Sequence, residues 1–141
     1  MSKCCRNFVT KTHIFDKNHK FQDFCCKFIE IAENFYDMSS CVGYEFWTQN
    51  NSRPSEWHYD KDEIAYTTKG VTRYPICSTV FYLEVQNLEN GKLQFKNGVE
   101  VTPRENRLVI FSPGLYHGVE QFNGVRTSIN VNPWNTQLYN K

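Results

Sequence analysis

Residues 92–132 decide the fold class, and their sequence is KLQFKNGVEVTPRENRLVIFSPGLYHGVEQFNGVRTSINVN. Short segments rich in Val, Ile, Leu and Phe alternate here with turn signals, which is typical of the strands of a sandwich or barrel. Asn97-Gly98 favours a tight hairpin of type I′, because both central positions of that turn need a positive φ. The turn signal Ser112-Pro113-Gly114 separates two further strands.

The same pattern extends upstream to Cys41. We place nine short strands, at residues 42–48, 57–60, 64–68, 78–86, 92–95, 99–102, 107–112, 116–120 and 126–132. A strand at residues 8–15 and one amphipathic helix precede them. The helix is indicated by apolar residues at steps of three and four, namely Phe21, Phe24, Cys25, Phe28, Ile31, Ala32, Phe35 and Met38. These elements predict a mainly β protein, a double-sheet jelly roll or related small barrel, with the helix on the outside of a sheet.

The chain has 141 residues and a formal net charge of +1. That length fits one domain, which we divide into residues 1–40 with the first strand and the helix, 41–134 with the jelly-roll core, and 135–141 as a tail. The near-neutral charge offers no broad basic face, so we expect no nucleic-acid partner. No apolar run approaches the ~18 residues of a membrane span, and the N-terminal MSKCCRNF lacks the apolar core of a secretory signal. We therefore expect a cytoplasmic protein with no membrane partner.

The six cysteines form two adjacent pairs and two single positions, without a C-x-x-C motif; they are Cys4, Cys5, Cys25, Cys26, Cys41 and Cys77. Adjacent cysteines cannot bridge each other without strain, and this spacing does not fit a zinc site. We expect reduced thiols that act as small apolar residues.

A metal site is the first chemical possibility, because His58 and Asp60 are two residues apart on a predicted strand and therefore share one face. A third donor completes a 2-His-1-carboxylate triad, which holds iron(II) and leaves other coordination positions open. His117, just after the Ser-Pro-Gly turn, is the best candidate. We interpret His13 and His19 as ordinary surface or packing residues.

The last predicted strand has one polar face, which consists of Arg126, Ser128, Asn130 and Asn132. An exposed sheet face explains this alternation in the simplest way. The alternative is a wet barrel interior in which Arg126 binds a carboxylate through two parallel hydrogen bonds and Ser128 adds a third.

Five segments resemble a known family. They are WHYD at residues 57–60, STVFYLE at 78–84, GKLQF at 91–95, NRLVIFSPGLYHGV at 106–119 and GVRTSINV at 124–131. Together, from about Tyr44 to Trp134, they resemble the iron(II) and 2-oxoglutarate-dependent oxygenases, and particularly the prolyl 4-hydroxylase-like branch. The resemblance implies a double-stranded β-helix, the cupin-like jelly roll.

The resemblance also implies the site. His58, Asp60 and His117 would hold iron(II), while Arg126 and Ser128 would bind the distal carboxylate of 2-oxoglutarate. Tyr82 matches a position from which relatives direct a phenol to that carboxylate, and its alternative role is that of a core tyrosine. The implied enzyme is a dioxygenase that uses O2 to hydroxylate a C–H bond, coupled to oxidative decarboxylation of 2-oxoglutarate to succinate and CO2.

The substrate is less defined by the sequence, and a peptidyl or free amino acid such as proline is the first expectation. Trp57, Asn130 and Trp134 are candidate substrate contacts, with packing as the alternative for the two tryptophans. Thr48 or Gln49 is a candidate to help hold the cosubstrate. Two other functions stay open: a cupin-like jelly roll that binds a metal or a small acid without oxygenase activity, and a metal-dependent oxygenase or isomerase that does not use 2-oxoglutarate. The Arg126-x-Ser128 pair argues against the cupin-like alternative, because a plain cupin needs no carboxylate clamp.

Overall fold

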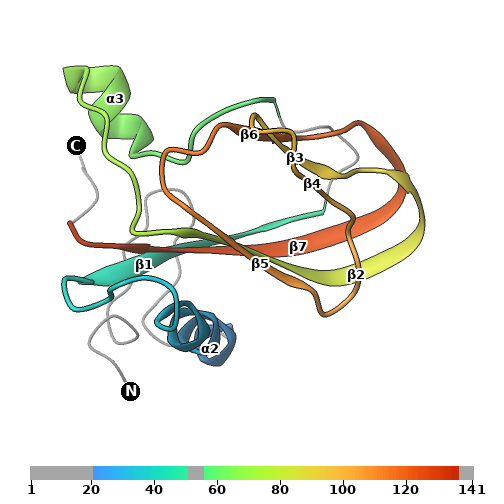
Figure 1. Cartoon of the computed structure of the whole chain (residues 1–141), viewed down its shortest axis with the longest axis horizontal. Helices are drawn as coiled ribbons and strands as arrows, with labels where there is room; N and C mark the ends of the chain where they lie inside the picture. The colour runs from blue at the N-terminus through green and yellow to red at the C-terminus, as the bar shows by residue number, and fades with distance from the viewer. Residues whose placement is uncertain (1–20, 51–55, 137–141) are drawn as a thin grey trace.

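The structure is a computed structural model that describes residues 21–50 and 56–136. Two antiparallel sheets form its body (Figure 1). The four-stranded sheet has the order β1-β7-β2-β5, and the three-stranded sheet has the order β4-β3-β6. The strands are β1 (Gly43–Gln49), β2 (Ser78–Asn90), β3 (Leu93–Phe95), β4 (Glu100–Val101), β5 (Leu108–Phe111), β6 (His117–Val119) and β7 (Phe122–Trp134). The predicted mainly β jelly roll is thus confirmed.

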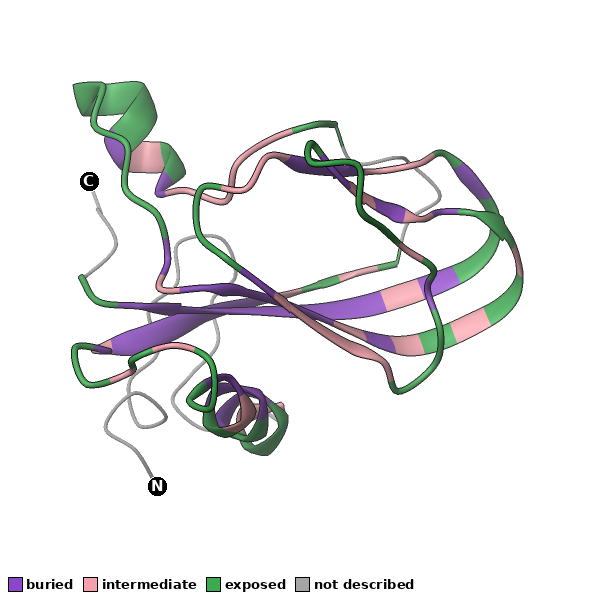
Figure 2. Ribbon diagram, viewed as in Figure 1, coloured by how far each residue is buried: buried purple, intermediate pink, exposed green. Residues whose placement is uncertain are grey.

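Helix α2 (Gln22–Ala32) covers the outer face of the four-stranded sheet (Figure 1). Its buried Phe28 and Ile29 belong to one apolar cluster with Ile129 and Val131 of β7. Figure 2 shows the same division, with the buried side of α2 toward the sheet and the exposed side toward solvent. The expected position of the helix is therefore confirmed, because the apolar face of β7 needs a cover on this side.

The two longest strands, β2 and β7, curve from the four-stranded sheet toward the smaller one (Figure 1). Their pairing shifts register between Tyr82 and Glu84 and again between Gln86 and Glu89, and such bulges bend a strand. Gly124 lies at the second irregularity with a φ of 104°, and a Cβ there would overlap the carbonyl oxygen of Asn87. The bend therefore needs glycine at this position.

One predicted strand, at residues 64–68, is wrong, because these residues lie in helix α3 (Glu63–Lys69). β-Branched Ile64, Thr67 and Thr68 suggested a strand. The helix is instead stabilised by the residues that cap its two ends. The Asp62 carboxylate accepts a hydrogen bond from the Ala65 N–H at 3.1 Å, and Gly70 ends the helix in the left-handed region with a φ of 65°.

Two further details differ from the sequence prediction. Residues 57–60 form no strand, and His58 makes only an isolated β-bridge. The hairpin at Asn97-Gly98 joins β3 to β4 as expected, but its turn is not of type I′. Only Gly98 of the pair has a positive φ, at 90°, and its N–H donates to the Phe95 carbonyl, which gives a three-residue loop.

The strand expected at residues 8–15, with His13, lies outside the described residues, as do His19, Cys4 and Cys5. Cys25, Cys26 and Cys77 are buried, as expected for cysteines that act as small apolar residues. Cys41 is disulfide-bonded, so the expectation of a reduced thiol is wrong at this position. In the part of the chain that the structure describes, no helix has the length and apolarity to cross a membrane.

Candidate metal and carboxylate site

His58 and His117 are brought together by their own backbones. Each donates its N–H to the carbonyl of the other, at 2.8 and 3.0 Å, which forms the isolated bridge between the 56–62 segment and β6. Residues paired in this way project their side chains from the same face of the sheet. The two imidazole rings accordingly lie with their centroids 4.5 Å apart.

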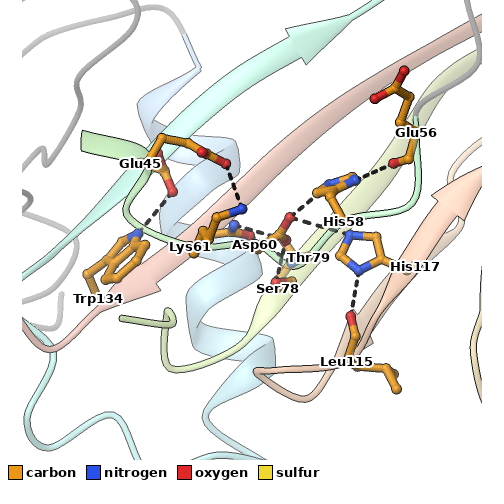
Figure 3. Close-up of polar contacts among 12 residues, drawn as sticks. Glu45, Glu56, His58, Asp60, Lys61, Ser78, Thr79, Leu115, His117 and Trp134 are labelled. Atoms are coloured by element: carbon orange, nitrogen blue, oxygen red, sulfur yellow. Dashed lines mark hydrogen bonds and ion pairs between the residues drawn. The ribbon is translucent and has the colours of Figure 1, made fainter. Parts of the chain in front are cut away.

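The Asp60 carboxylate completes this group (Figure 3). Its Oδ1 atom lies 3.3 Å from Nε2 of His58 and 3.3 Å from Nε2 of His117. Ligand atoms of the three residues all lie within 4.8 Å of one another, so one metal ion can be held among them. Two imidazoles and one carboxylate are a donor set that suits iron(II).

Backbone carbonyls fix the orientation of both imidazoles. Nδ1 of His58 lies 2.6 Å from the Glu56 carbonyl oxygen, and Nδ1 of His117 lies 2.7 Å from that of Leu115 (Figure 3). A carbonyl oxygen only accepts, so each Nδ1 carries a hydrogen. Each ring then donates an Nε2 hydrogen to Asp60 when it is protonated, and it offers the Nε2 lone pair to a metal ion when it is neutral. This is the arrangement that outer hydrogen bonds give to metal-binding histidines.

The second oxygen of Asp60 is held by the sheet below it. Ser78 Oγ donates to Oδ2 at 2.6 Å and Asn132 Nδ2 donates to it at 3.2 Å, which leaves Oδ1 facing the imidazoles. Burial alone would raise the pKa of Asp60, but the hydrogen bonds from His117, His58 and Ser78 outweigh it and hold that pKa well below its usual range. The hydrogen bond to Asp60 raises the pKa of His58. Asp60 is therefore an anion ready to bind a cation.

A cavity extends from the three donors along β7. Its polar side consists of Arg126, Ser128 and Asn130, and its apolar side consists of Val80, Leu93, Phe111 and Val119. The polar face of β7 thus lines an interior cavity and is not an exposed sheet face, while the binding of a carboxylate by Arg126 and Ser128 stays a prediction.

Arg126 lies at the end of the cavity away from Asp60 and is only 5% exposed. Its Nε donates to the Gly91 carbonyl at 3.0 Å, and its guanidinium lies 5.1 Å from the centre of the Tyr82 ring, with Nη2 3.5 Å from the phenol oxygen. Burial lowers the pKa of Arg126 and raises that of Tyr82. No carboxylate of the described residues pairs with this cation, and the buried Ser128 Oγ beside it has no hydrogen-bond partner. A buried cation with spare donors fits an anionic ligand such as a carboxylate.

The remaining candidates fall in different places. Asn130 lines the cavity, whereas Trp134 is fully buried and donates its indole N–H to Glu45. Trp57 is 42% exposed and stacks on Tyr116 at 5.7 Å between ring centroids, outside the cavity lining.

Trp47 was not among the residues predicted at the site, and the sequence pattern does not distinguish between Gln49 and Thr48. The structure separates them, because Trp47 and Gln49 line the cavity while Thr48 points to the opposite face of β1 and is exposed. The signal was available in the alternation of β1, but the pairing of Trp47 with Asn130 across the sheet is non-local.

Comparisons with solved structures give the same fold at low sequence identity. A prolyl-4-hydroxylase from Pseudomonas putida aligns with a TM-score of 0.54 and 19% identity over 86% of this chain and 68% of that chain. The viral collagen prolyl hydroxylase of Paramecium bursaria Chlorella virus-1 aligns with a TM-score of 0.50 and 17% identity over 86% of this chain and 75% of that chain. An oxidoreductase of the 2OG-Fe(II) oxygenase family from Burkholderia pseudomallei aligns with a TM-score of 0.50 and 17% identity, over 67% of this chain and 44% of that one.

No curated protein shows significant sequence similarity to the chain. A family model, by contrast, matches residues 45–134, which is more than half of the sequence and includes every residue that lines the cavity. That model describes the 2OG-Fe(II) oxygenase superfamily, whose cofactors are iron(II) and 2-oxoglutarate. The two imidazoles, the carboxylate and the buried guanidinium suit these two cofactors, and the chain belongs to the 2OG-Fe(II) oxygenase superfamily.

Proposed function

We propose that the protein is an iron(II)- and 2-oxoglutarate-dependent dioxygenase that hydroxylates a C–H bond of its substrate. The observation that carries this proposal is the arrangement of the cavity. Three side chains that could hold a metal ion converge on one another, and the cavity beside them also contains a buried guanidinium that has no carboxylate partner among the described residues. A dianionic cosubstrate that chelates a metal needs both of these groups.

In this proposal His58, Asp60 and His117 bind iron through two Nε2 atoms and Oδ1. The carbonyls of Glu56 and Leu115 orient the two rings and keep the hydrogen on Nδ1, so that Nε2 is the nitrogen left to bind a metal. Three protein ligands on one side leave the other coordination positions for the cosubstrate and O2.

Arg126 and Ser128 bind the distal carboxylate of 2-oxoglutarate, and the Tyr82 hydroxyl contributes beside them. The Gly91 carbonyl and the Tyr82 ring hold the guanidinium in place before the ligand arrives. Iron(II) and 2-oxoglutarate, when bound, would supply the oxidation, in which one atom of O2 enters succinate as CO2 is released and the other becomes the hydroxyl group of the substrate. The protein provides orientation and an apolar wall that limits water.

For the substrate, we propose a peptidyl or free amino acid, with proline as the first compound to test. The support is the likeness of the fold to proteins described as a prolyl-4-hydroxylase and a viral collagen prolyl hydroxylase. Trp47 and Gln49 of β1 line the cavity from the edge strand of the sheet. We propose that they contact the substrate, in place of the deeply buried Trp134.

The test is turnover with iron(II), 2-oxoglutarate, ascorbate and O2, in which succinate is measured first without substrate and then with prolyl peptides and free amino acids. We expect slow succinate formation alone and a severalfold increase with the true substrate. Asp60→Ala should abolish both, and the exposed control Asn135→Ala should abolish neither. Absence of succinate in every mixture would contradict the proposal and favour the two alternatives that do not use 2-oxoglutarate.

A further inference from the structure

The inward face of β7 carries polar side chains at every second residue, between the two ends of the cavity. Asn132 donates a hydrogen bond to Asp60, one of the three candidate metal ligands. Arg126, six residues before Asn132 on the same strand, is the cation that lines the cavity. Asn130 and Ser128 lie between them. In the sheet register Asn130 is paired with Val80, and each lies two residues from a residue that donates to Asp60, namely Asn132 and Ser78. Ser128 is paired with Tyr82, and the Tyr82 hydroxyl lies 3.5 Å from the Arg126 guanidinium.

No hydrogen bond of the described residues explains why a buried amide is present at Asn130. The residue is 6% exposed, it lines the cavity, and its Nδ2 has no hydrogen-bond partner in the described structure. A buried donor without a partner destabilises a folded protein relative to an apolar residue of similar size. Such a group is explained when a ligand supplies the missing acceptor.

We propose that the Asn130 amide donates a hydrogen bond to the carboxylate of 2-oxoglutarate that lies beside the metal, while Arg126 and Ser128 bind the distal one. This inference rests on the proposed function. Asn130 and Arg126 are four residues apart, about 13 Å of strand, and Nη2 of Arg126 lies 3.5 Å from the hydroxyl of Tyr82, whose backbone pairs with Ser128. A five-carbon diacid therefore meets a separate donor at each end. The sequence suggested a substrate contact for Asn130, and its position between Asp60 and Ser128 assigns it to the cosubstrate instead.

The first test separates binding from folding. Asn130→Leu removes the donor and keeps the approximate volume, so the metal-free protein should unfold at the same or a higher denaturant concentration than the wild type. The iron(II) protein, titrated without O2, should bind 2-oxoglutarate about tenfold more weakly, as read from its visible charge-transfer band. Asn130→Ala, which cannot overpack the cavity, should show the same weakening.

The second test uses 2-oxobutyrate, which has the keto acid end of 2-oxoglutarate but no distal carboxylate. Asn130→Leu should weaken 2-oxobutyrate and 2-oxoglutarate by the same factor. Arg126→Ala should weaken 2-oxoglutarate alone, because only that ligand has a group for Arg126 to bind.

Two results overturn the inference: Asn130 variants that bind both keto acids as tightly as the wild type, or variants that lose 2-oxoglutarate while retaining 2-oxobutyrate. A wild-type iron protein that gives no band with 2-oxoglutarate overturns the proposed function itself, so the two failures are distinguishable.

Discussion

Asn132 Nδ2 lies 3.2 Å from Oδ2 of Asp60, although 72 residues separate them in the sequence. Ser78 donates to the same oxygen at 2.6 Å, so the central strands β2 and β7 together fix the carboxylate from below. The result is that only Oδ1 faces the imidazoles. The candidate metal site is therefore supported by the sheet and does not depend on the 56–62 segment alone.

Removal of the shorter of these bonds should weaken iron binding without loss of the fold. Ser78→Ala frees Oδ2, and changes of this kind beside metal ligands typically cost 10- to 100-fold in metal affinity. We expect about a tenfold weaker iron(II) affinity, measured by competition with a chelator under anaerobic conditions. Asn135→Ala, at an exposed position after β7, should leave the affinity unchanged. Equal affinities for Ser78→Ala and wild type would show that the sheet does not orient Asp60.

Iron binding should weaken in mild acid, because protons compete for the same Nε2 atoms. The pKa of His58 is raised above its usual 6.5 by Asp60, so iron(II) affinity should fall as the pH drops through that raised value. Equilibrium titrations at pH values from about 5 to 8 check this. A flat profile would mean that the imidazoles are not ligands.

The metal-free protein should respond to pH in a different way. The pairing of protonated His58 with Asp60 is fully present below pH 6.5 and is lost as the pH rises through the raised pKa of His58. The lowered pKa of Asp60 contributes stability above 3.8, and this is lost as the pH falls through the folded-state pKa. Denaturant unfolding should show greater stability between these values than at neutral pH, and iron should remove or reverse that trend.

Gly91→Ala should weaken the cosubstrate and not the metal. A Cβ at Gly91, where φ is 79°, would lie 3.1 Å from Cβ of Phe122 and 3.3 Å from Cδ of Arg126, and so would displace the guanidinium. Gly98 is a matched control, since its φ is 90° but nothing lies within 4 Å of a Cβ there. Both variants should lose about 1 kcal/mol of stability from backbone strain. Only Gly91→Ala should raise the dissociation constant for 2-oxoglutarate, and similar constants for the two variants would contradict the role of Arg126.

Cys77 should be unreactive in the folded protein. Burial raises the pKa of its thiol to about 12, so little thiolate is present near neutral pH. Mass spectrometry of the peptide that contains Cys77 should show alkylation at pH 8 only in denaturant. Rapid alkylation of the native protein would show that the start of β2 opens readily.

The polar face of β7 was predictable because it follows from alternation along a single strand. Arg126, Ser128 and Asn130 are two residues apart, so they share one face of the strand whichever strand it pairs with. The convergence of His58 with His117 needed a bridge between distant segments, which no local pattern shows.

The errors have local physical causes. At residues 64–68 the β-branched side chains favour a strand, but the capping residues Asp62 and Gly70 determine a helix. Trp47 was missed because its position beside the cavity depends on which strand pairs with β1. Alternation in the sequence predicts which residues of a strand share one face. Which of these faces lines the cavity depends on how the strands pair, and that pairing is non-local.

The most direct measurement is an anaerobic titration of the wild-type protein, first with iron(II) and then with 2-oxoglutarate, followed by visible absorbance. We predict one iron per chain and a charge-transfer band that saturates at one 2-oxoglutarate per iron. The band should be absent in Asp60→Ala, and in Arg126→Ala it should require a much higher 2-oxoglutarate concentration. A protein that binds iron through His58, Asp60 and His117 but gives no band at any 2-oxoglutarate concentration would contradict the account.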